Sequence, residues 1–232
     1  MPRHLLPALA AALLLACLQP ALAKPITVVT SGGRPLAGAV VRVTKLDGTS
    51  FVATLDPEGR IRVYEVPLGV VVLDVIEWKG VPVNARCVVT PRNCTVVCTK
   101  VGALVVYVVG SRGQGLRGAD VTILWQGKVV EHGVTGGDGS YATELPEGDY
   151  TVVASYKGRE GRAEVSVAGG DTVSIWMTLD VFLEILGVPL SAAEFAGLVV
   201  ALILAIVALF VGLYEYTAWR RRRLVAAVVR AR

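Results

Sequence analysis

The hydrophobic pattern of this 232-residue chain changes twice along its length, and each part predicts a different element. Between residues 24 and 180, short apolar runs rich in valine alternate with glycine, proline and aspartate. Runs such as ADVTIL, YTVVAS and AEVSV are typical of β-strands, whereas GGDG and LPEG are typical of turns. No long stretch before residue 180 has helical periodicity. The middle of the chain is therefore predicted to be all-β.

One phrase of this β region occurs twice. RPLAGAVVRV (34–43) matches QGLRGADVTI (114–123) with an offset of 80 residues. DPEGR then matches GGDGS, VPLG matches LPEG and WKG matches YKG, with offsets of 80, 79 and 78. Landmarks that keep their order and spacing indicate a duplicated unit. We expect two tandem small β-sandwiches, residues 24–100 and 101–179, and we expect the repeated phrase to be their hairpin region.

The repeated motifs resemble those of carboxypeptidase regulatory-like domains, the transthyretin-related sandwiches of seven strands. PLAGAVVRV and DPEGRIRVYEVPLG carry the resemblance in the first copy, and GLRGADVTI and GDGSYATELPEGDYTVVAS carry it in the second. The second copy has Gly148-Asp149-Tyr150 where the first has Gly69-Val70-Val71, so the first lacks the family's tyrosine. The resemblance implies the fold but little about activity, because such domains are attached to peptidases, receptors and surface proteins alike.

Collagen-adhesin B-type repeats look similar as well. Those repeats often contain a Lys–Asn isopeptide cross-link. The second copy contains no asparagine, so that cross-link is excluded there.

The first 23 residues have the layout of a cleaved secretory signal. A basic start at Arg3 and His4 precedes an apolar run and the small-residue site Ala21-Leu22-Ala23, so Lys24 would be the first mature residue. The apolar run is short for a membrane span. A lipoprotein box ending at Cys17 is the alternative, and it would place a lipid on that cysteine.

Residues 195–214, FAGLVVALILAIVALFVGLY, form an uncharged run of 20 residues. A helix of that length is about 30 Å long, which is the thickness of the hydrocarbon core. Aromatic residues and four arginines follow, namely Tyr216, Trp219, Arg220, Arg221, Arg222 and Arg223. The positive-inside rule then places the arginines in the cytoplasm and the β region outside. The prediction is a single-pass type I protein of the cell membrane, with a juxtamembrane segment at 180–194, a spanning helix at 195–216 and a basic tail at 217–232.

The spanning helix has small residues along one face: Gly197, Ala201, Ala205, Ala208 and Gly212. This pattern has two interpretations, a face for close helix packing in an oligomer or with a partner, and the ordinary abundance of alanine and glycine in spanning helices. The tail has two as well, a segment that lies on an anionic leaflet and a plain stop-transfer signal. Residues 181–190, VFLEILGVPL, are too apolar for a free linker, and we expect an interfacial segment that seats the outer domains close to the membrane.

Charge adds a topology signal. The net charge is +4, yet residues 24–180 contain 16 lysines and arginines against 16 aspartates and glutamates. A nucleic-acid-binding protein carries its basic charge on the folded domain. The neutral β region therefore excludes nucleic acid as a partner.

Three cysteines lie close together in the first copy: Cys87, Cys94 and Cys98. Export favours a disulfide. A turn at Arg92-Asn93 would pair Cys87 with Cys98, which is the preferred pairing, and a turn at Thr90-Pro91 would pair Cys87 with Cys94. No histidine is near to complete a zinc site, so no metal is expected. Asn93 begins an Asn-Cys-Thr sequon and is a glycosylation candidate.

The sequence offers no catalytic set. His132 is the only histidine after residue 23, so no Ser-His-Asp triad, Cys-His pair or paired-histidine metal site can be assembled. Carboxylates such as Asp56 and Glu58 lie in turns, and the chain has neither a phosphate-binding loop nor a dense acidic calcium loop. We expect a protein without enzymatic activity or cofactor.

The leading hypothesis is a membrane-anchored extracytoplasmic binding or spacer protein that contacts a protein or glycan on the outer face. The alternative is an accessory subunit of a membrane transport or secretion complex, held by its helix. An enzyme or its regulatory fragment is disfavoured. Only two asparagines and three glutamines occur, which is a compositional hint of a thermophile.

Overall fold

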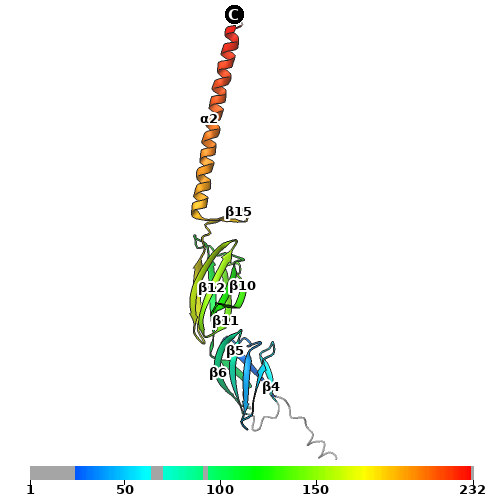
Figure 1. Ribbon diagram of the computed structural model, residues 1–232. Coiled ribbons are helices and arrows are strands. Elements are labelled where there is room, and N and C mark those ends of the chain that lie inside the picture. The colour runs from blue at the N-terminus through cyan, green and yellow to red at the C-terminus, as the bar shows by residue number, and fades with distance from the viewer. Residues whose placement is uncertain (1–23, 64–69, 91–93, 231–232) are drawn as a thin grey trace, which may run out of the picture.

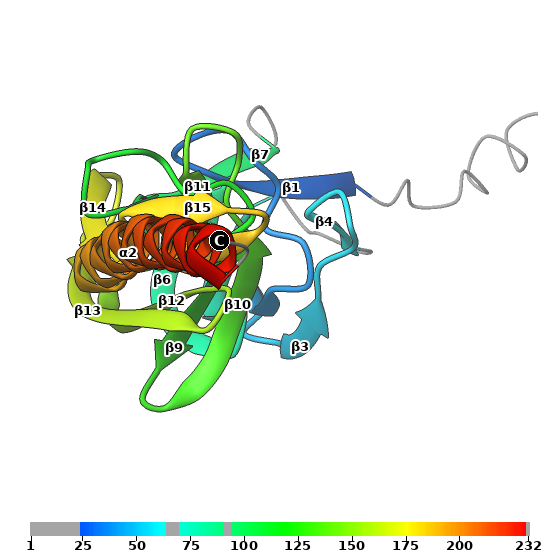
Figure 2. The same cartoon turned by 90° about the horizontal axis from the view of Figure 1, so that it is seen from above.

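The computed structural model describes residues 24–63, 70–90 and 94–230. Figure 1 shows two β-sandwiches and a long helix, one after another in chain order. Figure 2 shows the helix end-on above the second sandwich, with the blue strands of the first sandwich displaced to one side. The predicted class, two tandem sandwiches followed by one membrane-spanning helix, is confirmed.

The first sandwich has a four-stranded sheet with the order β3-β2-β5-β6 and a three-stranded sheet with the order β4-β1-β7. Its strands are β1 (Lys24–Thr30), β2 (Val40–Lys45), β3 (Ser50–Thr54), β4 (Arg60–Val63), β5 (Val71–Trp78), β6 (Val81–Val89) and β7 (Thr95–Cys98). Strand β1 pairs antiparallel with β4 and parallel with β7. Valines at alternate positions of β2 and β5 point into the core, as the period of a half-buried strand requires.

The second sandwich repeats this strand order. The sheet β10-β9-β12-β13 faces the sheet β11-β8-β14, in which the last strand again pairs parallel with the first. Its strands are β8 (Val101–Val109), β9 (Asp120–Trp125), β10 (Lys128–Val134), β11 (Ser140–Pro146), β12 (Gly148–Tyr156), β13 (Arg159–Val167) and β14 (Thr172–Thr178). The strands predicted from ADVTIL, YTVVAS and AEVSV lie in β9, β12 and β13.

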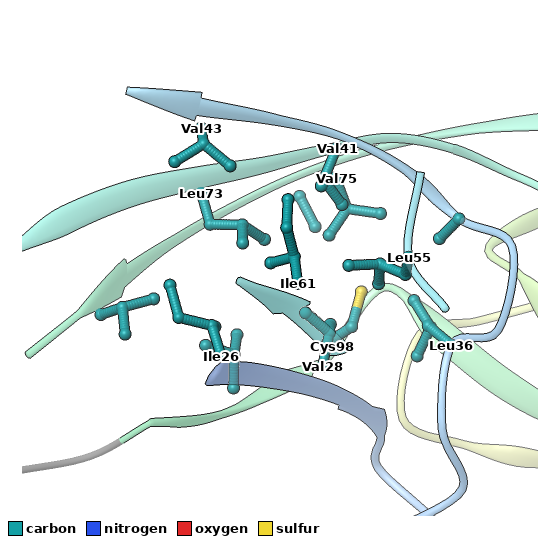
Figure 3. Packing of buried hydrophobic residues seen from close by; sticks show 14 of the residues in the cluster. Ile26, Val28, Leu36, Val41, Val43, Leu55, Ile61, Leu73, Val75 and Cys98 are labelled. Atoms are coloured by element: carbon teal, nitrogen blue, oxygen red, sulfur yellow. The ribbon is translucent and has the colours of Figure 1, made fainter. Parts of the chain in front are cut away.

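Each sandwich has its own core. Figure 3 shows Val41 and Leu73 of one sheet facing Ile26 and Val28 of the other in the first sandwich, with the sulfur of Cys98 among them. The second core contains Tyr150, which is only 2% exposed and donates a hydrogen bond of 2.7 Å to the carbonyl of Pro146. Burial raises the pKa of the Tyr150 hydroxyl, so it remains a donor.

The repeated phrase differs from its predicted form at LPEG. Leu145 and Pro146, expected in a turn, end β11, and Glu147 alone connects β11 to β12 in the opposite sheet. Leu145 is fully buried, which keeps the chain in the strand up to the core boundary. The hairpin comes later, at Lys157 and Gly158, where both residues have positive φ.

A short hairpin and a long helix complete the chain. Strands β15 (Leu183–Ile185) and β16 (Val188–Leu190) pair antiparallel, and α2 (Ala192–Arg230) follows with 39 residues. The stretch of α2 that is long and apolar enough to cross a membrane is Ala192–Arg220. It contains the predicted span, and its most apolar part is not covered by the rest of the described protein.

Candidate functional site

The turn between β5 and β6 fastens the first sandwich to the second. Lys79 lies in this turn with a φ of 53°. Its ammonium group donates to the carboxylate of Glu131, to Thr143 Oγ1 at 3.2 Å and to the backbone carbonyl of Glu144 at 3.0 Å. It also lies 4.9 Å from the ring centroid of Trp78. One lysine of the first sandwich is therefore held at three points on the second.

Apolar and polar contacts widen this junction. Val81, which follows the same turn, is 1% exposed and packs in the core of the second sandwich. Ser31 Oγ donates to the carbonyl of Val101 at 3.3 Å, and the Arg34 guanidinium lies 4.0 Å from the carboxylate of Glu144. Val81 thus belongs to the first sandwich in the chain but is buried in the core of the second. Burial of a valine side chain contributes about 1.5–3 kcal/mol, which stabilises the contact between the two sandwiches.

The equivalent turn of the second sandwich fastens it to the juxtamembrane hairpin. Lys157 has a φ of 47° and donates to Glu184 Oε1 at 2.5 Å and to the carbonyl of Gly187 at 3.1 Å. The hydroxyl of Tyr156 donates to the other Glu184 oxygen at 2.7 Å. These hydrogen bonds, first that from Lys157 and then that from Tyr156, lower the pKa of Glu184. The Lys157–Glu184 pair is therefore ionised at neutral pH.

The first turn of α2 is held by a third contact. Ser191 and Glu194 form a capping box, in which the Glu194 amide donates to Ser191 Oγ at 3.2 Å and the Ser191 amide donates to Glu194 Oε2 at 2.7 Å. Arg159 of β13 donates to both Glu194 oxygens at 2.7 and 2.5 Å. The helix start is thus tied directly to the second sandwich.

The sequence carried a signal for this start. Ser-Ala-Ala-Glu at 191–194 is a capping-box motif directly before an apolar run. The prediction rested on the uncharged run alone and placed the start of the span at Phe195. The structure begins the helix at Ala192.

A cavity of about 550 Å³ lies between the hairpin and the end of the second sandwich. The loop after β8 lines one side with Arg112 and Arg117, and the segment before the hairpin lines the other with Phe182 and Glu184. The Arg112 guanidinium lies 5.5 Å from the Phe182 ring centroid. Arg117 is exposed and forms no ion pair with the residues that the structure describes.

The outer face of the β11-β8-β14 sheet carries a stacked aromatic pair. The rings of Tyr107 and Trp176 are nearly parallel, with centroids 4.4 Å apart and an interplanar angle of 14°. Trp176 is 67% exposed. The neighbouring positions on this face are small: Ala103, Val105, Ser140, Ala142 and Ser174. The pair is therefore accessible from the solvent.

The cysteines do not lie on a hairpin. Strand β6, which contains Cys87, belongs to one sheet, whereas β7, which contains Cys98, pairs parallel with β1 in the other. Because β6 and β7 lie in different sheets, they are not paired with each other, and the expectation that Cys87 meets Cys94 or Cys98 across a hairpin is wrong.

The three thiols, including Cys94, are free in the structure. Cys87 nevertheless packs against the core that contains Cys98. Burial, more than the neighbouring Cys87 charge, raises the pKa of the Cys98 thiol. A Cys87–Cys98 bond across the core stays a prediction.

Other predicted sites are not assembled into a centre. His132 is exposed on β10, with its Nε2 3.9 Å from the carboxylate of Asp120. Within residues 24–63, 70–90 and 94–230, no group of three or more His, Cys, Asp or Glu side chains is placed to hold a metal ion. Asn93, Cys17 and the predicted signal lie outside the described residues.

The face of α2 that carries the small residues is not covered by the rest of the described protein. A Cβ added at Gly197 or Gly212 would meet nothing within 4 Å. The face is free to approach another helix, but the described protein contains no second spanning helix.

Comparison with known proteins identifies one domain. Residues 103–180, which run from β8 to the end of the second sandwich, match the carboxypeptidase regulatory-like domain family. No curated protein matches the chain.

Among solved structures, the chain is similar to the Bacillus anthracis TIE protein, with 20% identity, a TM-score of 0.31 and coverage of 67% of this chain and 33% of that one. It is also similar to GBS52, the minor pilin of Streptococcus agalactiae, with 14% identity, a TM-score of 0.34 and coverage of 67% and 95%. Klebsiella pneumoniae 5-hydroxyisourate hydrolase matches 33% of this chain and 90% of its own, with 16% identity and a TM-score of 0.28. The chain thus spans a third of the TIE protein. Scores this low carry no argument about function.

Proposed function

We propose that this chain, whose second sandwich is a carboxypeptidase regulatory-like domain, is a membrane-anchored extracytoplasmic protein that binds or spaces a partner and catalyses no reaction. The observation that carries the proposal is that side-chain contacts connect each unit of the chain to the next, from the first sandwich to α2. We call these contacts joints. Lys79 joins the two sandwiches, Lys157 joins the second to the hairpin, and Arg159 joins it to the helix. A chain fastened at every joint is suited to hold its outer sandwich at a set position above a membrane.

The orientation follows from charge. Four arginines, Arg220–Arg223, come directly after the apolar part of α2, and the positive-inside rule favours their placement in the cytoplasm. Both sandwiches would then be extracytoplasmic, and residues 1–23 would be the signal that exports them. The shared strand order of the two sandwiches supports duplication of one unit, with the boundary at the start of β8.

The stacked pair Tyr107 and Trp176 is the surface that supports a binding role. Aromatic rings present a broad apolar face and bind flat apolar surfaces such as the face of a sugar ring. A stacked pair held on two neighbouring strands is rigid, so little side-chain entropy is lost on binding. We therefore favour a surface glycan or glycoprotein as the partner.

The test compares partners recovered in mild detergent from cells that express the full-length protein. Trp176→Ala is expected to lose the specific partner, while Phe51→Ala, which truncates another exposed aromatic residue, is expected to keep it. A third variant with leucine at all five small positions, Gly197, Ala201, Ala205, Ala208 and Gly212, tests the alternative. Loss of partners only in this leucine variant would contradict the proposal and favour an accessory subunit held by its helix.

A further inference from the structure

We propose that the membrane-proximal end of the second sandwich is a phospholipid-binding site. In this proposal the tip of the β15–β16 hairpin, Ile185 to Val188, enters the bilayer interface, and Arg112 and Arg117 bind the phosphate of a lipid headgroup in the cavity beside it. The proposal rests on the proposed function in one respect, which is that α2 spans the membrane.

The apolar side chains of the hairpin tip are exposed to solvent in the described protein. Leu186 is fully exposed, with a relative accessibility of 101%, and Val188 and Ile185 are 58% and 37% exposed. Leu186 also has a φ of 51°, in the left-handed region that glycine or asparagine adopts more easily. Neither turn geometry nor packing explains a leucine here. Contact with lipid does explain it, because lipid removes this side chain from water.

The hairpin lies at the level of the membrane surface. Figure 1 shows it lying across the base of α2. Ser191 alone separates Leu190 from the first helical residue, and the uncharged run begins at Phe195. Three helical residues span about 4.5 Å at 1.5 Å per residue. The headgroup layer is itself about 5–7 Å thick on each side, so the hairpin and the headgroups occupy the same level.

The hairpin is held in this orientation. Lys157 binds both the Glu184 side chain and the carbonyl of Gly187 at the tip. At its base, the rings of Phe182 and Phe195 pack with centroids 5.5 Å apart. These contacts fix the hairpin at the end of the second sandwich while the apolar side chains of its tip stay exposed, so the tip is held where it can meet the membrane.

The cavity beside the hairpin has the charge that a phosphate requires. Arg112 and Arg117 line it, and the arginine fork matches the geometry of phosphate oxygens. Its carboxylate, Glu184, is already engaged by Lys157 and Tyr156, which leaves the two guanidinium groups as the free charge. A volume of about 550 Å³ is within the usual range of small-molecule sites and accommodates a headgroup.

A depth measurement tests the hairpin. Spin labels are attached at Leu186→Cys, at Leu46→Cys and at Leu204→Cys in the full-length protein, with all native cysteines replaced, in phosphatidylcholine–phosphatidylglycerol nanodiscs. Leu46 is a matched control, because it is an exposed leucine, 59% accessible, at a hairpin tip of the first sandwich. Accessibility to oxygen relative to a water-soluble nickel reagent is expected to rank Leu204 deepest, Leu186 at the interface and Leu46 in water.

Two outcomes of this measurement separate the proposals. A Leu186 label as water-accessible as the Leu46 label, with Leu204 buried, overturns the hairpin anchor and leaves the spanning helix intact. A Leu204 label in water contradicts the proposed function itself.

Lipid retention tests the cavity in the protein with its native cysteines, so this arm does not depend on the replaced background. Native mass spectrometry counts phospholipids that remain on protein released from the nanodiscs. Arg112→Gln/Arg117→Gln is expected to lower retention roughly tenfold or more, because each charge-assisted hydrogen bond removed costs about one order of magnitude. The control Arg42→Gln/Arg62→Gln removes two arginines from the first sandwich and is expected to retain lipid. Equal retention in both variants overturns the headgroup site.

Discussion

Lys79 and Lys157 occupy the same turn of two different sandwiches, and each binds the next unit along the chain. Both have positive φ, 53° and 47°, and both lie over the aromatic ring that precedes them, at 4.9 and 5.3 Å from the centroid. Lys79 reaches the second sandwich, whereas Lys157 reaches the juxtamembrane hairpin. The Trp-Lys-Gly and Tyr-Lys-Gly turns thus have the same role, because the lysine of each turn connects its sandwich to the next unit of the chain.

The first prediction concerns the joint between the sandwiches. Lys79→Ala is expected to destabilise the docked arrangement by about 1–3 kcal/mol, because the partly buried Glu131 carboxylate loses its charged partner. Thermal unfolding of the full-length protein in detergent measures this loss. Lys128→Ala, at an exposed lysine of β10, is the matched control. The charge exchange Lys79→Glu/Glu131→Lys is expected to recover part of the stability, and an equal effect of the two alanine variants would speak against the joint.

The second prediction concerns pH. Glu184 has a lowered pKa, so its pair with Lys157 stabilises the docked hairpin above the ordinary value of 4.5 and is lost as the pH falls through the lowered value. The protection factors of the backbone amides at residues 183–190, which correct for the pH dependence of free amide exchange, are expected to be high at neutral pH and to fall as the pH decreases below 4.5. Glu184→Gln is expected to remove the pH step. A step of the same size in that variant would assign it to another group.

The third prediction concerns the buried tyrosine of the second sandwich. Tyr150→Phe leaves the Pro146 carbonyl without its donor, and we expect a loss of about 1–3 kcal/mol. Tyr107→Phe removes the hydroxyl of a partly exposed tyrosine that stacks through its ring, and we expect little change. Melting temperatures of the two variants give the comparison. Equal values would exclude the hydrogen bond as a source of stability.

The fourth prediction concerns the cysteines. If the first sandwich is exported, Cys87 and Cys98 face one core from opposite sheets and are expected to oxidise to a disulfide, with Cys94 left free. Such a bond stabilises a small domain by about 2–4 kcal/mol. Peptide mapping of protein purified from membranes without reductant identifies the bond. Alkylation of all three thiols before reduction would rule it out.

Pattern alone predicted the strands and the spanning helix, because alternating and continuous apolar runs report local burial. The contacts that join one unit to the next could not be predicted from the sequence. Lys79 lies 52 residues from Glu131 in the chain, and no local spacing reveals such a contact. The connection at Glu147, where the chain passes from one sheet to the other, was predicted to be a turn, because proline and glycine occur in turns and in such connections alike. The two sheets that separate Cys87 from Cys98 depend on the parallel pairing of β1 with β7, which is a long-range property of the fold.

The central claim is that the joints hold the outer sandwich in one orientation. Spin labels at Leu46→Cys in the first sandwich and Val129→Cys in the second, both exposed apolar positions, report this orientation through their distance distribution. The measurement uses the full-length protein in nanodiscs by pulsed electron resonance, with the native cysteines replaced. We expect one narrow distance that broadens when Lys79→Ala is added. A distribution that is already broad with Lys79 in place would contradict the claim.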